Sequence, residues 1–230
     1  MKNKINYAGI LIFYIIAVSL RYLTNKTTLP DHFTNPFLKA VLQGMGPAVG
    51  ALVVFTLFKI KPVLSLKGNY KSLVTPFLLY WALPVILIST VQYFANGTIA
   101  IATVFTILIY GLLEETGWRG YLQQELKPLP PFFSIIIIAT LWFIWHLNFD
   151  LSSSNLLFWG ILVLGSWGIG KVADSTHSLI AVSAFHSLNN FFPEVKTTQM
   201  IIIITLVLIW VISLMIRKKQ LEKKLATAAA

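Results

Sequence analysis

The sequence lacks cysteine altogether and is poor in charge: only 11% of its 230 residues are Asp, Glu, Lys or Arg. Without cysteine, disulfides, thiolate catalysis and cysteine-ligated metal sites are excluded. Soluble globular domains carry about 25% charged residues, so the shortage of charge argues against a soluble protein. Acidic side chains are the scarcest, since eight Asp and Glu stand against 18 Lys and Arg and give a formal net charge of +10.

Hydrophobic residues make up 57% of the chain, and its mean hydropathy is +0.76. This composition is typical of a membrane protein that crosses the bilayer several times. The basic residues concentrate at the ends of apolar runs, as membrane orientation requires, and no basic face interleaved with aromatic residues is available for nucleic acid. We therefore expect one integral-membrane domain over residues 1–230, with the lipid bilayer and not nucleic acid as its partner.

The apolar runs predict an all-α fold, a polytopic membrane helix bundle of about eight transmembrane helices. The second run contains Gly44, Gly46 and Gly50, small residues that let helices approach closely. Pro84 predicts a bend in the third run, and Arg21 directly follows the first run and is expected in the connection after it. The expected spans cover approximately residues 5–20, 36–58, 73–95, 98–126, 132–147, 156–172, 179–192 and 200–216.

The distribution of Lys and Arg predicts the orientation of this bundle. Eight spans place both termini on the same side of the membrane, and the positive-inside rule makes that side the cytoplasm. Lysines mark the start of the chain, the connection at 59–71 and the tail after residue 216. The loops at 96–97, 150–155 and 193–199 carry few basic residues and are expected on the opposite side.

One apolar stretch nevertheless contains three charged side chains, Glu114, Glu115 and Arg119. From Ile99 to Leu113 every residue is apolar, Thr or Gly, so the cluster lies on an apolar segment and not in a soluble loop. An ionisable group inside a membrane helix costs about 2.5–3.5 kcal/mol on insertion scales, which makes the cluster a candidate functional site. Glu115 and Arg119 are four residues apart and can pair on one helical face, which leaves Glu114 free.

Three further polar residues stand out in the later spans: His146, His186 and Asn190. With Pro128 taken as the cytoplasmic level, Glu114 lies about 21 Å along its helix and His146 about 27 Å. On the same scale His186 lies about 15 Å and Asn190 about 21 Å into the seventh span. These four groups fall within roughly two helical turns in depth, so we expect them to meet in one hydrated cavity.

Such a cluster suits the hydrolysis of a peptide bond. A buried carboxylate can act as general base toward water, and an Asn amide beside a His supplies donors to a developing oxyanion. Two neutral histidines and a carboxylate can instead hold a divalent metal such as zinc, here through Glu114, His146 and His186. The residues alone leave metal-dependent and metal-free chemistry open, and the stronger zinc motif His-Glu-x-x-His is absent.

Three motif blocks, in order and each on its own apolar run, give the chain a family resemblance. It resembles the CAAX prenyl protease and bacteriocin-processing (CPBP, or Abi) intramembrane endopeptidases, which are related to the Ras-converting CAAX protease. The family blocks are Glu-Glu-x-x-x-Arg, Phe-x-x-x-His and His-x-x-x-Asn or Asp. Here they are residues 114–119, 142–146 and 186–190, within a motif core of about 110–190. The second block has Trp142 in place of Phe, an aromatic exchange that we expect to be neutral.

The resemblance implies a role for each motif residue. Glu114 with His146 would activate a water molecule, His186 and Asn190 would stabilise the oxyanion, and the charged pair after Glu114 would support the site. The substrate would be a peptide or protein, cut in a cavity open to the cytoplasm, and the family has been described both as metalloproteases and as metal-independent glutamate proteases. Two alternatives stay open: a non-catalytic bacteriocin-immunity protein or membrane scaffold with the same fold, and a transporter.

Overall fold

A computed structural model describes residues 4–99, 101–150, 152–191, 200–206, 208–210, 212 and 215–216 of the chain. Within these residues the regular structure is helical, and an isolated parallel bridge between Ser65 and Ser178 is the only β pairing among them. The all-α fold class that the apolar runs predicted is therefore confirmed.

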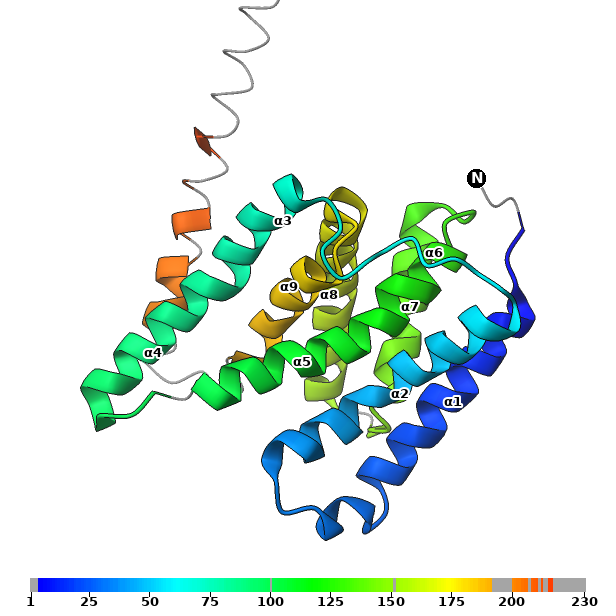
Figure 1. Cartoon of the computed structure of the whole chain (residues 1–230), viewed down its shortest axis with the longest axis horizontal. Helices are drawn as coiled ribbons and strands as arrows, with labels where there is room; N and C mark the ends of the chain where they lie inside the picture. The colour runs from blue at the N-terminus through cyan, green and yellow to red at the C-terminus, as the bar shows by residue number, and fades with distance from the viewer. Residues whose placement is uncertain are drawn as a thin grey trace, which may run out of the picture.

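The helices pack together into one bundle, in which some neighbours run side by side and others cross at wide angles (Figure 1). The first part of the chain forms α1 (Tyr7–Asn25), the short η1 (Leu29–His32), α2 (Pro36–Leu57), α3 (Tyr70–Phe77), the wide turn η2 (Leu78–Ala82) and α4 (Leu83–Asn96). The second part forms α5 (Ile101–Gly117), the wide turn η3 (Trp118–Leu122), α6 (Gln123–Glu125), α7 (Pro131–Trp145), α8 (Ser153–Thr176) and α9 (Leu179–Phe191).

In the described part of the chain, five helical segments are long and apolar enough to cross a membrane. They cover residues 7–25, 36–57, 70–95, 101–125 and 153–176. The helices α7 and α9 have only 15 and 13 residues, fewer than the roughly 20 that a bilayer crossing needs. The expected count of about eight spans is therefore not confirmed, and the last expected span, residues 200–216, lies partly outside the described residues.

Asparagine residues begin three of these helices. The side chain of Asn6 accepts a hydrogen bond from the backbone N–H of Gly9, and Asn35 and Asn69 cap α2 and α3 in the same way. Such caps satisfy backbone donors that a helix leaves unpaired at its N-terminus. The polar caps before the apolar runs thus mark in the sequence where these helices begin.

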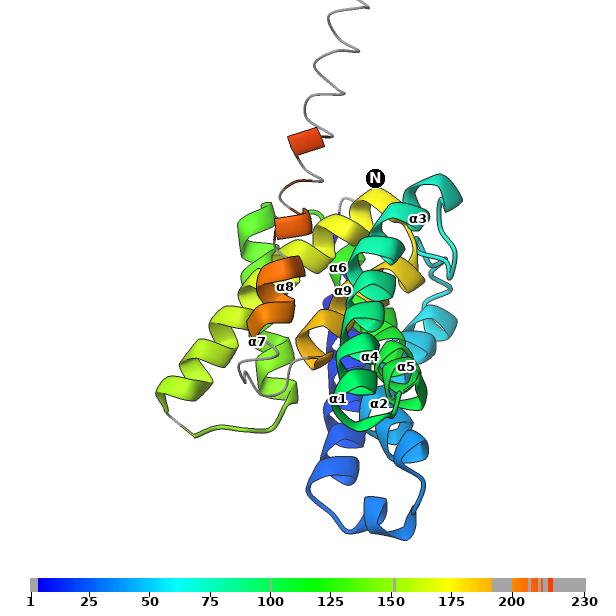
Figure 2. The same ribbon diagram turned by 90° about the vertical axis from the view of Figure 1, so that its left-hand side faces the viewer.

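The helix α5 occupies the middle of the bundle, where it packs against α2 and α9 (Figure 1). The helix α1 lies along α2, and α7 and α8 form a second pair at the side of the bundle (Figure 2). At Gly46 a Cβ atom would stand 2.7 Å from the carbonyl oxygen of Ala17, so only glycine permits this approach of α2 to α1. The close packing predicted from the glycines of the second span is confirmed.

The irregularity predicted near Pro84 lies just before it. In η2 the N–H of Leu83 bonds to the carbonyl of Leu78, five residues back, instead of the usual four. Pro84 has no N–H to donate, and the widened turn accommodates the proline without ending the helix. Residues 70–96 therefore form one rod, visible at the edge of the bundle in Figure 1.

Arg21 corrects the predicted end of the first span. The helix α1 continues to Asn25, so Arg21 lies inside the helix and not in a connection. The residue is 9% exposed, its guanidinium carbon lies 4.2 Å from the ring centroid of Trp145, and its Nη1 donates to the carbonyl oxygen of Gln43 at 3.1 Å. The cation–π contact and the backbone acceptor offset the desolvation of the charge, which hydropathy does not register.

The lysine-rich connection between α2 and α3 is fixed to the turn between α8 and α9. The N–H of Ser65 donates to the carbonyl of His177 at 3.1 Å, and the N–H of Asn69 donates to the carbonyl of Thr176 at 2.8 Å. These bonds join the lysine-rich connection to the end of α8 and the start of α9. They therefore help to position the helix that carries His186.

Candidate active site

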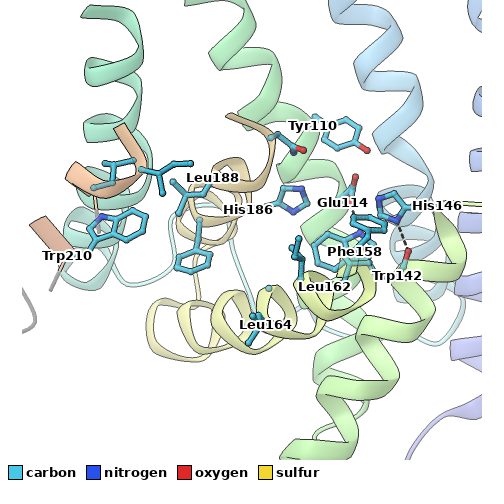
Figure 3. Close-up of a pocket in the computed structure, with 16 residues that line it drawn as sticks. Tyr110, Glu114, Trp142, His146, Phe158, Leu162, Leu164, His186, Leu188 and Trp210 are labelled. Carbon is cyan, nitrogen blue, oxygen red and sulfur yellow. Dashed lines mark hydrogen bonds between the residues drawn. The ribbon is translucent and has the colours of Figure 1, made fainter. Parts of the chain in front are cut away.

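One cavity gathers the four residues predicted to carry the chemistry (Figure 3). It has a volume of about 610 Å³, and its walls include residues of α5, α7, α8 and α9. Glu114, His146, His186 and Asn190 all line it. The prediction that these groups meet in one cavity is confirmed, whereas the catalytic roles expected for them stay predictions.

Glu115 and Arg119 form the ion pair that their spacing predicted. Arg119 Nη1 lies 3.0 Å from both carboxylate oxygens of Glu115, and both side chains are fully buried. Arg119 belongs to the wide turn η3, and turns of this kind are frequent at functional sites. Its Nη2 donates to the hydroxyl of Ser166 on α8 at 3.5 Å, so the pair also ties α5 to α8.

Glu115 also binds His186. Nδ1 of His186 lies 2.6 Å from Oε1 of Glu115, and both groups are buried. An ionised carboxylate only accepts hydrogen bonds, so Nδ1 carries the hydrogen and donates it. The other ring nitrogen, Nε2, is left for the cavity that His186 lines. One carboxylate is therefore shared by an arginine of its own rod and a histidine from α9.

Glu114 has a hydrogen-bond partner, and the prediction that it is left free is wrong. The residue is 1% exposed, and its Oε2 accepts a hydrogen bond from the indole Nε1–H of Trp142 at 2.8 Å. Trp142 lies on α7, whereas Glu114 lies on α5. A neutral donor from another helix thus satisfies one oxygen of this carboxylate.

His146 is the C-cap residue of α7, and Figure 3 shows its ring beside Glu114. Its Nδ1 lies 2.8 Å from the carbonyl oxygen of Trp142, so Nδ1 carries a hydrogen and donates it. In the neutral ring the lone pair is then on Nε2, the form that accepts a hydrogen bond from water. Trp145 and Phe158 pack edge-on against the ring, with centroids at 5.1 and 4.9 Å, and fix its plane.

Asn190 brings an amide to the same cavity from the end of α9. Its Nδ2 is buried and has no hydrogen-bond partner among the residues that the structure describes. A buried donor without a partner is unfavourable, and an oxygen of a bound ligand would satisfy it. Asn190 follows His186 by four residues, so both side chains lie on the same face of α9.

Residues 96–192 match the family described as type II CAAX prenyl endopeptidase Rce1-like. The chain is similar to this endopeptidase family over that region. The matched region includes all three motif blocks and α5 to α9, whereas α1 to α3 precede it. No curated protein and no solved structure matches the chain. The similarity indicates a protease, and several apolar helices suit an integral-membrane location.

The candidate active site includes residues that the motif blocks did not single out. Tyr110 lines the cavity, and its hydroxyl is close enough to interact with both Glu114 and Arg21. The available signal was spacing, because Tyr110 precedes Glu114 by four residues and shares its helical face. Arg21 carried no such signal, since it lies on α1, far from the blocks in the sequence.

The described residues of the candidate site do not fit a three-ligand metal site. No group of three His, Cys, Asp or Glu side chains in the described part of the chain is arranged to hold a metal ion. Glu114, His146 and His186 line one cavity without forming such a group. The mechanism proposed for the site therefore uses protein groups and water.

Proposed function

We propose that the protein is an intramembrane endopeptidase that hydrolyses a peptide bond with a water molecule activated by Glu114 and His146. The observation that carries this proposal is the meeting of a buried carboxylate, two imidazoles and an amide in one cavity, in a chain that is similar to CAAX endopeptidases. Placing polar groups inside a membrane costs free energy. A common function in binding and activating water explains why these groups are retained at one site.

In the first step Glu114 acts as the general base. A water molecule between Glu114 and Nε2 of His146 gives a proton to the carboxylate, and its oxygen attacks the carbonyl carbon of the peptide. The new C–O bond forms while the electrons of the carbonyl π bond move to oxygen. His146 accepts a hydrogen bond from the same water and directs its attacking lone pair toward the substrate.

The resulting oxyanion is stabilised by two groups on α9. Nδ2 of Asn190 donates one hydrogen bond, and protonated His186 donates a second from Nε2–H. Glu115 supplies the opposing charge at Nδ1 of His186, where the 2.6 Å contact lies. Removal of one oxyanion donor typically lowers kcat by about 10²–10³-fold. The unpartnered amide of Asn190 supports this role.

Collapse of the tetrahedral intermediate breaks the peptide C–N bond. The proton held by Glu114 passes to the leaving nitrogen, which departs as an amine, and the other product is a carboxylic acid. Glu114 returns to its ionised form, so the cycle consumes only water and the peptide.

The proposal includes an orientation. The lysine-bearing connections favour the cytoplasm for their end of the bundle, and the N-terminus belongs to that end because the N–H of Asn6 donates to Glu125 of α6 at 2.5 Å. Both termini and the opening of the cavity are assigned to the cytoplasmic side. The cavity walls beyond the polar groups are apolar, with Phe158, Leu162 and Phe185 among them, and suit a hydrophobic peptide segment.

Cleavage of fluorogenic CAAX-type peptides, with and without a prenyl group, by the purified protein in lipid nanodiscs tests the proposal. Glu114→Gln and His146→Asn are each expected to lower kcat by about 10²–10⁴-fold, because each removes a group that handles the proton of water. His32→Ala, which changes an exposed histidine of η1, is the control and is expected to keep the parent rate.

The same panel separates the proposal from its alternative. If Glu114→Gln and His146→Asn both cleave peptide as fast as the parent, these residues do not carry the hydrolysis and the assignment is wrong. A parent protein that binds a partner but cleaves no peptide under any condition would instead favour a non-catalytic immunity or scaffold protein.

A further inference from the structure

Trp142 stands where the related motif has Phe, and the exchange that was expected to be neutral adds a buried hydrogen bond. The residue is 2% exposed, and its indole N–H is the donor to Oε2 of Glu114 at 2.8 Å. A Phe ring could occupy much of the same space but has no hydrogen to donate. In this chain the second motif block therefore supplies a hydrogen-bond donor to Glu114 as well as an aromatic ring.

Trp142 is itself held in place by the other polar groups of the site. The guanidinium carbon of Arg119 lies 4.7 Å from the centroid of its ring, and the ring of His186 lies 5.3 Å away, centroid to centroid. Its backbone carbonyl accepts the hydrogen bond from Nδ1 of His146. One residue thus contacts Arg119 and His186 with its ring, Glu114 with its indole N–H and His146 with its backbone.

The indole donor affects Glu114 in two ways. A hydrogen bond to a carboxylate oxygen stabilises the ionised form, which is the form that a general base needs. It also restrains rotation of the carboxylate, because Oε2 is held by Trp142 and Oε1 is left as the oxygen that can turn toward water near His146. A carboxylate without this donor would turn more freely.

We propose that Trp142 is a positioning residue for peptide hydrolysis, whose indole N–H holds the Glu114 carboxylate with Oε1 turned toward the water beside His146. This inference rests on the proposed function, in which Glu114 is the base. Trp142 acts through Glu114 and takes no part in bond making or breaking.

The decisive comparison is Trp142→Phe against Trp159→Phe. Trp159 lies on α8, is partly buried, and donates its indole N–H to the hydroxyl of Thr140 on α7 at 3.2 Å. Both variants lose one indole hydrogen bond to a neighbouring helix and keep an aromatic ring, but only Trp142→Phe removes a donor to Glu114. A purely structural contribution should therefore affect the two variants alike.

Steady-state cleavage in nanodiscs is expected to separate them. Trp142→Phe should lower kcat by about 10–100-fold, the usual effect of removing an outer partner of a reacting group, with KM nearly unchanged. Trp159→Phe should leave kcat and KM close to those of the parent.

A second measurement does not depend on activity. In detergent-solubilised protein with ¹⁵N-labelled tryptophan, the indole N–H resonance of Trp142 is identified by its loss in Trp142→Phe. Glu114→Gln replaces the charged acceptor with a neutral amide, so this resonance should shift, whereas that of Trp159 should not. The readout stays available even where the Trp142→Phe variant is inactive.

The outcomes are distinguishable. If the parent cleaves peptide and Trp142→Phe retains its kcat, the positioning role is wrong and the protease stands. If the parent cleaves nothing, the proposed function fails, and the positioning role fails with it. If the indole resonance of Trp142 does not shift in Glu114→Gln, the hydrogen bond on which the inference rests is absent.

Discussion

Glu115 contacts two other buried polar groups of the site. Its carboxylate lies 3.0 Å from the guanidinium of Arg119 and 2.6 Å from Nδ1 of His186, with all three side chains buried. Arg119 and the His186 ring, when protonated, carry positive charge and offset the desolvation of the carboxylate. Removing the charge of Glu115 would take away the negative charge that contacts both Arg119 and His186.

Glu115→Gln is therefore expected to lower the free energy of unfolding by about 3–5 kcal/mol, the usual effect of breaking a buried ion pair. Asp174→Asn is the matched control, since it breaks the half-exposed pair of Asp174 with Lys127 at 3.2 Å and should cost at most about 1 kcal/mol. Denaturant-induced unfolding in detergent, followed by circular dichroism, measures both. Equal losses in the two variants would contradict the structural importance given to Glu115.

Side-chain partners within one helix were predictable from the sequence, and partners across helices were not. The pairing of Glu115 with Arg119 follows from a spacing of four residues on one helical face. The contacts of Glu114 with Trp142 and of Glu115 with His186 join residues 28 and 71 positions apart. Their existence depends on how each helix is rotated about its axis, which an almost uniformly apolar sequence does not specify.

At the scale of the helices, α5 approaches α2 closely at Gly117. A Cβ atom at this position would lie 2.4 Å from Cβ and 2.6 Å from the carbonyl oxygen of Pro47. Backbone atoms cannot yield as a flexible side chain can, so even alanine would separate the helices. Because Gly117 lies between Glu115 and Arg119 in the sequence, such a separation would also disturb their pairing.

Gly117→Ala is expected to lower the free energy of unfolding by about 1–3 kcal/mol through overpacking. Gly160→Ala is the control, because Gly160 also lies inside a helix but has nothing within 4 Å of the new Cβ atom. There the gain in helix propensity should stabilise the protein by up to about 1 kcal/mol. The unfolding curves of the two variants are expected to shift in opposite directions relative to the parent. A Gly117→Ala variant as stable as the parent would mean that α5 and α2 lie further apart than in this structure.

The apolar runs predicted which segments form helices, but they predicted the ends of these helices less accurately. The helix α1 continues past its predicted end because the hydroxyl of Thr24 donates to the carbonyl of Leu20, and because Arg21 finds partners on neighbouring helices. The helix α7 ends at Trp145, where the next residues include Leu147 with a positive φ of 56°. Hydropathy measures how apolar a run is, whereas these ends depend on individual hydrogen bonds and backbone angles.

At the scale of the whole molecule, the lysine-rich connection and the active-site groups occupy different depths. The lysine-rich connection at 59–71 is bonded to the end of α8, where Asp174 also meets Lys127. Glu114 lies 14 residues before Pro128, or about 21 Å of helix from that end. The site is therefore expected within the hydrocarbon region, and which face supplies its water depends on the orientation of the bundle.

The absence of cysteine makes this orientation directly measurable, since each introduced cysteine is the only thiol. Ser153 and Ser175 are exposed serines at opposite ends of the 24-residue helix α8, about 35 Å apart along its axis. A membrane-impermeant maleimide added to intact spheroplasts should label Ser153→Cys and spare Ser175→Cys, because Ser175 lies at the lysine-bearing end. Inverted vesicles should give the opposite pattern. The reverse result in both preparations would place the lysine-bearing end outside, against the positive-inside rule, whereas labelling of both cysteines from one side would mean that α8 does not cross the membrane.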